Sequence, residues 1–99
     1  MAQRVIILKR ADQKVKQVYA YLLENWNQKV ADEFYEKFKK IIHIISLQPE
    51  IGRPSAKQPD IRRKLVTKHN CLYYRIKDDS VIIINMLDTR RNPMKNSYE

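Results

Sequence analysis

The chain has 99 residues, with 20 Lys and Arg against 11 Asp and Glu, and a formal net charge of +9 at pH 7. This length suits one small domain, so we expect residues 1–99 to form a single unit. With one glycine, Gly52, and one cysteine, Cys71, the sequence excludes a glycine-rich phosphate loop and a disulfide framework.

Neither histidine has neighbours at metal-ligand spacing, and we expect no metal and no other cofactor. No apolar run approaches the ~20 residues of a membrane helix, which predicts a cytoplasmic protein without a membrane partner. Both halves of the chain are basic. This charge predicts a polyanionic partner, either a nucleic acid or an acidic protein.

The first half of the chain predicts one strand and two helices. A β-branched run within residues 4–9 is typical of a short buried strand. An apolar stripe at helical spacing, ending in Trp26, predicts a helix over residues 11–26. Asn27 is a candidate N-cap for a second helix, which Pro49 ends. The short break between the helices predicts an antiparallel helical hairpin.

The second half predicts a loop followed by three strands. Residues 49–60 hold three of the four prolines and the glycine, which favours a loop. Strands are expected at residues 61–66, 72–76 and 81–87, with a tight turn at residues 77–80. The last strand is apolar on both faces, which predicts an interior position in the sheet.

The predicted order is therefore β-α-α-β-β-β. It indicates an α+β fold, in which an N-terminal strand and a helical hairpin precede a three-stranded antiparallel meander. We expect the helices to pack on one face of the sheet.

Basic side chains recur on the predicted strands and could gather on the open face of the sheet. Alternation places Arg62 and Lys64 on one face, while Ile61 and Leu65 take the other, which we expect the helices to cover. The open face would be rimmed by five cations, with tyrosines such as Tyr74 between them: Arg62, Lys64, Arg75, Arg90 and Arg91. Such a face suits single-stranded RNA, and it suits an acidic peptide nearly as well.

Motifs across almost the whole chain resemble the RelE/ParE superfamily of bacterial type II toxins, which are linked to plasmid stabilization. The matching pieces include the Ala31-x-x-Phe34 start of the second helix, Pro49-Glu50-x-Gly52, residues 69–76, and residues 88–93. The resemblance implies a growth-inhibiting toxin that is neutralised by a cognate antitoxin with an acidic, partly helical segment.

The superfamily has two known activities, and the resemblance leaves both open for this chain. RelE-like members act on the ribosome as metal-independent endoribonucleases that cut mRNA, which is the leading expectation. The resemblance then assigns Arg62, Lys64 and Arg91 to the scissile phosphate, and Tyr98 or His69 to proton transfer. Arg75, Tyr74 and Arg90 would contribute to binding. The alternatives are a non-enzymatic ParE-like inhibitor of DNA gyrase and an inactive member that only binds its antitoxin.

Overall fold

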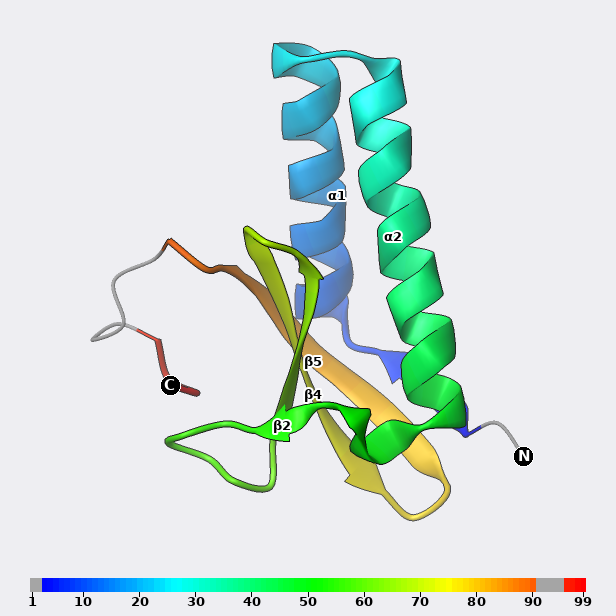
Figure 1. Ribbon diagram of the computed structural model, residues 1–99, viewed down its shortest axis with the longest axis vertical. Helices are drawn as coiled ribbons and strands as arrows, with labels where there is room; N and C mark the ends of the chain where they lie inside the picture. Colours follow the sequence, from blue (N-terminus) through cyan, green and yellow to red (C-terminus); the bar gives the residue numbers. More distant parts are fainter. Residues whose placement is uncertain (1–2, 91–95) are drawn as a thin grey trace.

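The computed structural model describes residues 3–90 and 96–99. A five-stranded sheet forms one layer, and two antiparallel helices pack against one of its faces to form the other (Figure 1). The predicted α+β class and helical hairpin are therefore confirmed. Within the described residues, no helix is both long enough and apolar enough to cross a bilayer.

The two helices are α1 (Lys9–Asn25) and α2 (Gln28–Leu47). The predicted N-cap is confirmed, because the Asn27 side chain accepts a hydrogen bond of 2.9 Å from the backbone N–H of Val30. Helix α1 begins two residues earlier than expected. Its predicted apolar stripe stays buried only along the part that meets the sheet, and Trp26 is 68% exposed because the joined ends of the helices rise away from the sheet (Figure 1).

The strands have the spatial order β1-β5-β4-β3-β2. They are β1 (Arg4–Ile7), β2 (Arg53–Pro54), β3 (Arg62–Thr67), β4 (Asn70–Lys77) and β5 (Ser80–Asp88). Strand β1 runs parallel to β5, and the other neighbours are antiparallel. The three predicted strands are present, β5 is interior as expected, and the predicted loop additionally contains β2 and a 3-10 helix at Pro49–Ile51.

The turn between β4 and β5 lies where it was predicted. Asp78 adopts a φ of 56°, in the left-handed region that aspartate tolerates better than most residues. The register of β4 against β5 shifts between Tyr73 and Tyr74, which pair with Asn85 and Ile83. One extra residue of β5, Ile84, therefore forms a bulge at the middle of the sheet.

The prediction that the first strand is buried was wrong. Ile6 and Ile7 of β1 are both exposed, although they point to opposite faces of the sheet. Strand β1 is the outermost strand at its end of the sheet, so it has a neighbour on one side only. A β-branched run identifies a strand but does not distinguish an edge position from an interior one.

The sheet buries apolar side chains on both faces. On the helix side, Leu72, Tyr74 and Ile83 pack with residues of both helices, and those from α2 include Phe34 and Phe38. The opposite face has its own cluster, which consists of Ile61, Cys71, Tyr73, Leu87 and Tyr98. Cys71 is a free cysteine and is buried in the sheet.

Candidate functional surface

Strand β3 places Arg62 and Lys64 on one face, as alternation predicts, but this is the helix side of the sheet. Their cross-strand partners are Tyr74 and Leu72, which belong to the helix-packed core. The two faces of β3 were therefore predicted the wrong way round. Ile61 lies in the opposite cluster, and Leu65 is 46% exposed instead of lying under the helices.

Arg62 and Tyr74 hold the loop that follows α2. The Arg62 guanidinium donates to the carbonyl oxygens of Gly52, at 2.7 Å, and Glu50, at 3.2 Å. The Tyr74 hydroxyl donates to the carbonyl of Pro49 at 2.7 Å and accepts from the N–H of Gly52 at 2.9 Å. Burial raises the pKa of Tyr74, against the lowering effect of the Gly52 hydrogen bond. Two predicted site residues thus have a structural task, since they fix the Pro49-Glu50-x-Gly52 motif.

The C-terminal residues cover the face of the sheet that was expected to be open. Tyr98 is 5% exposed, and its ring stacks on that of Tyr73 with centroids 4.5 Å apart and an interplanar angle of 22°. The Asn96 side chain donates to the Tyr73 hydroxyl at 3.2 Å. Lys57 donates its N–H to the Tyr98 carbonyl and its Nζ to the Asn96 carbonyl. The concave, solvent-open cationic face predicted from the sequence is therefore closed at its centre.

The buried Tyr73 predicts a distinct alkaline titration. Burial, which penalises the charged form, raises the pKa of Tyr73 from 10.0 to about 12, and the Asn96 hydrogen bond opposes this shift. Because the folded-state pKa is the higher one, its stabilising contribution is complete below pH 10 and is lost as the pH rises through about 12. We expect spectrophotometric titration to show a tyrosine transition near pH 12, which a Tyr73→Phe variant would lack. The absence of such a transition in the natural chain would contradict the packing of the C-terminal residues on Tyr73.

The remaining cations of the predicted rim lie apart. Arg75 is on the face opposite Tyr74 and lies 3.9 Å from Asp60. Arg90 donates to the Asp88 carboxylate with Nε at 3.0 Å and Nη2 at 2.7 Å, and these bonds lower the pKa of Asp88 to about 2. Arg91 lies outside the described residues. The described members of the rim do not converge on one ligand position.

His69 lies at the other end of β3 from Arg62. Its backbone N–H bonds to the Thr67 hydroxyl at the end of β3, and Thr67 is five positions beyond Arg62 along the strand, roughly 17 Å. Within the described residues, the groups predicted for phosphate binding and for proton transfer are therefore distributed over the molecule. Their catalytic roles remain predictions.

A groove beside His69 was not predicted from the sequence. It has a volume of about 490 Å³ and lies between the helices and the β3–β4 turn, with Leu22, Val30 and Phe34 as apolar lining. Its polar lining residues are Glu33, Lys37, Thr67, Lys68, His69 and Asn70. Helix α2 and the turn are remote in sequence, so no local pattern predicts their contact.

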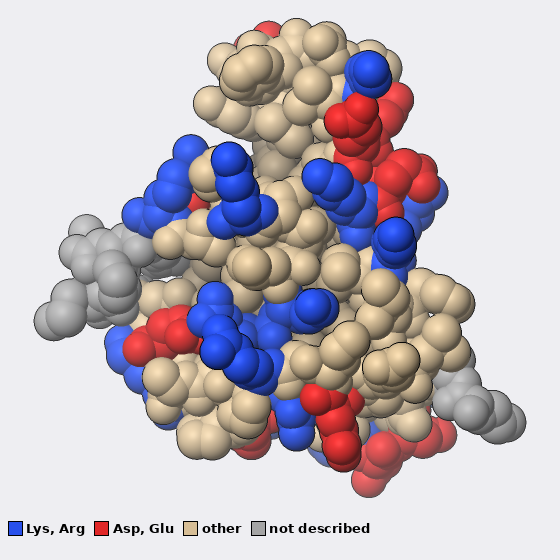
Figure 2. All heavy atoms as spheres, in the orientation of Figure 1, with Lys and Arg blue, Asp and Glu red and all other residues tan. Residues whose placement is uncertain are grey.

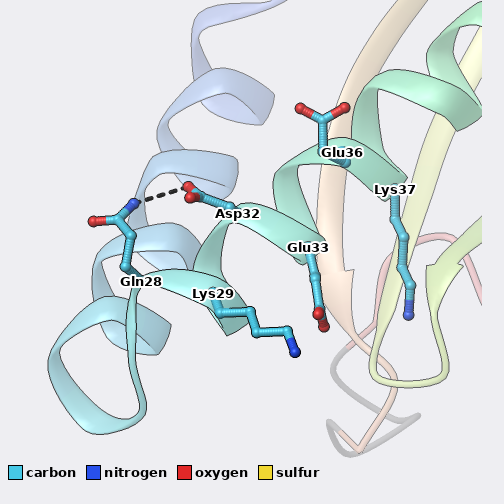
Figure 3. Close-up of a pocket in the computed structure, with 6 residues that line it drawn as sticks. All are labelled: Gln28, Lys29, Asp32, Glu33, Glu36 and Lys37. Atoms are coloured by element: carbon cyan, nitrogen blue, oxygen red, sulfur yellow. Dashed lines mark hydrogen bonds between the residues drawn. The ribbon is translucent and has the colours of Figure 1, made fainter.

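The outer surface of α2 next to this groove carries alternating charges. Lys29, Glu33 and Lys37 project to one side of the helix, whereas Glu36 points away from them (Figure 3). Gln28 donates to Asp32 at 2.9 Å, and Asp32 also accepts from Tyr19 of α1 at 2.7 Å. This surface contains mutually compensating charges, and it is typical of a solvated helix face.

Comparisons with known proteins agree on one family. A family model described as the ParE toxin of the type II toxin-antitoxin system parDE matches residues 5–93. No curated protein sequence matches the chain. A solved chain of the chromosomal ParDE system of P. aeruginosa is similar in fold, with a TM-score of 0.75 at 13% identity over 88% of this chain and 96% of that one. A YoeB/ParE toxin from Agrobacterium tumefaciens has a TM-score of 0.62 at 12% identity, covering 86% and 96%.

Proposed function

Because the chain belongs to the ParE toxin family of type II toxin–antitoxin systems, we propose that it arrests growth as a non-enzymatic inhibitor of DNA gyrase. The superfamily's other activity, ribosome-dependent mRNA cleavage, would require residues placed for proton transfer. Inhibition by binding requires a surface and no general base.

The observation that carries this proposal is the position of the proton-transfer candidates. RNA cleavage removes a proton from the 2′-hydroxyl and delivers one to the 5′-oxygen, so its acid and base must reach the same phosphate. Tyr98 is buried against Tyr73, and His69 lies at the opposite end of β3 from Arg62. Arg62 already donates to two loop carbonyls. These positions favour a binding protein.

The groove beside His69 supports a second part of the proposal, which concerns the antitoxin. Family membership implies a cognate antitoxin. An amphipathic helix buries its apolar side in a groove and exposes its polar side at the rim. The groove has apolar residues at Leu22, Val30 and Phe34, and its charged lining residues are two cations, Lys37 and Lys68, and one carboxylate, Glu33. We propose that the acidic, partly helical segment of the antitoxin lies here.

Conditional expression with separate labelling of new DNA and new protein tests the proposed function. We expect DNA synthesis to stop first, with a DNA-damage response, while translation continues initially. Tyr98→Phe is a matched variant, because it keeps the buried ring and removes only the hydroxyl. It should arrest growth as strongly as the natural chain. Early loss of translation with cuts in translated mRNA, abolished by Tyr98→Phe, would contradict the proposal.

A further inference from the structure

A small cationic notch lies at the β2 edge of the sheet. It has a volume of about 180 Å³ and is lined by Arg53 of β2, Arg63 and Lys64 of β3, and the apolar side chains of Ile51 and Leu65. Lys and Arg side chains gather on the face of the molecule around β2 (Figure 2). Arg53 and Arg63 were not among the site residues predicted from the sequence.

The charges of this notch are poorly compensated by the residues that the structure describes. Arg53 and Arg63 are direct cross-strand partners, and like charges in that position destabilise a sheet. Among residues 3–90 and 96–99, the one carboxylate within ion-pair distance of the three cations is Glu99, whose Oε1 lies 3.5 Å from Arg63 Nε. An anion bound between the two guanidinium groups would remove this repulsion.

The apolar walls distinguish between two kinds of anionic ligand. Ile51 is 40% exposed and Leu65 is 46% exposed, so aliphatic surface borders the cations. Unspecific binding of single-stranded nucleic acid uses exposed aromatic rings for base stacking. In the described part of the chain, the exposed aromatic residues are Tyr21, Trp26 and Tyr35, all on the helical hairpin. The notch therefore fits a peptide better than a nucleic acid.

We propose that the notch binds a carboxylate side chain of an acidic peptide segment, with a neighbouring apolar side chain of that segment packed on Ile51 and Leu65. The antitoxin is the source of the segment, and in this respect the inference rests on the proposed function. The notch is at the β2 edge, whereas the proposed helix groove is at the β3–β4 turn, so one partner chain would cross β3 between two separate contacts.

Glu99 acts as an internal competitor for this site. Its Oε1 is buried, and it makes no hydrogen bond within the described residues although Arg63 is its neighbour. The Glu99–Arg63 ion pair thus lacks a hydrogen bond to Oε1. A peptide carboxylate that reaches both Arg53 and Arg63 forms better charge-assisted hydrogen bonds and displaces Glu99 from Arg63.

The test uses the full chain and a short capped peptide of alternating glutamate and leucine, with the glutamine counterpart and a single-stranded oligonucleotide as comparison probes. NMR titration reports the Arg53 and Arg63 Nε–H groups and the methyl groups of Ile51 and Leu65. We expect Arg53→Gln to weaken binding of the acidic peptide by about tenfold, as for loss of a charge-assisted hydrogen bond. Lys39→Gln is the matched control, since it removes the same charge from an exposed position on α2 and should change binding little.

Further outcomes decide the proposal. Glu99→Gln should strengthen peptide binding, because it removes the competing carboxylate. Equal losses in Arg53→Gln and Lys39→Gln, equal binding of the glutamine peptide, or tighter binding of the oligonucleotide at the same resonances would overturn the proposal. Peptide binding is measured without gyrase or growth, so its failure is distinguishable from failure of the proposed function.

Discussion

Replacing Gly52 by alanine is expected to lower the free energy of unfolding by about 3 kcal/mol, which chemical denaturation would measure. A Cβ at this position would lie 2.5 Å from the Tyr74 hydroxyl oxygen and 2.7 Å from the carbonyl oxygen of Arg63. The cost is steric, because the φ of Gly52 is −74°, which any residue adopts. The glycine is required by the close approach of this loop to the sheet.

A double-mutant cycle isolates the contact. Tyr74→Phe removes the hydroxyl that meets the new Cβ, so Gly52→Ala should cost less in the Tyr74→Phe background than in the natural chain. Part of the cost should remain, since the Arg63 carbonyl is backbone and cannot move as freely. The same cost in both backgrounds would show that the Tyr74 hydroxyl does not hold the loop.

Replacing Tyr98 by alanine is expected to destabilise the chain by about 4 kcal/mol, in the range for deletion of a buried aromatic ring. The substitution removes the ring that stacks on Tyr73 and opens the cluster of Ile61, Cys71 and Leu87. The pKa of Tyr73 should fall back toward 10.0, because its burial is lost. Denaturant unfolding and alkaline titration of the same variant measure the two effects.

Tyr98→Phe separates the ring from its hydroxyl. Within the described residues, the Tyr98 hydroxyl forms no side-chain hydrogen bond, so this variant should cost less than about 1 kcal/mol. A large loss of stability in Tyr98→Phe, or a negligible loss in Tyr98→Ala, would contradict the packing of the C-terminal residues on the sheet.

The elements themselves could be predicted because their signals are local. Helical spacing of apolar residues indicated the first helix, and the Asn27 side chain supplied the cap expected for the second. The strand predicted at residues 81–87 was expected to be interior because both of its faces are apolar, and the observed β5 lies between β1 and β4. Each of these inferences depends on residues within one element or on a short connection.

The assignment of faces failed because it depends on tertiary packing. Alternation correctly paired Arg62 with Lys64, but it carries no information on which side the helices lie. Because Leu65 is aliphatic, its face of β3 was assigned to the helix side, which was wrong. An exposed leucine is not distinguishable from a core leucine by residue type alone. The position of Tyr98 against Tyr73 was equally inaccessible, because the two residues are 25 positions apart along the chain.

The candidate site was therefore predicted only in part. The basic character of β3 was evident from the sequence, whereas the commitment of Arg62 to loop carbonyls needs the positions of Glu50 and Gly52. The notch at Arg53 and the groove at His69 each join elements that no local pattern connects.

Incubation of the purified chain with purified DNA gyrase and, in parallel, with translating ribosomes distinguishes gyrase inhibition from mRNA cleavage. We expect gyrase to lose its supercoiling activity while the translated mRNA stays intact. Uninhibited gyrase together with new cuts in the mRNA would contradict the account, because cleavage needs converging groups that the described residues keep apart.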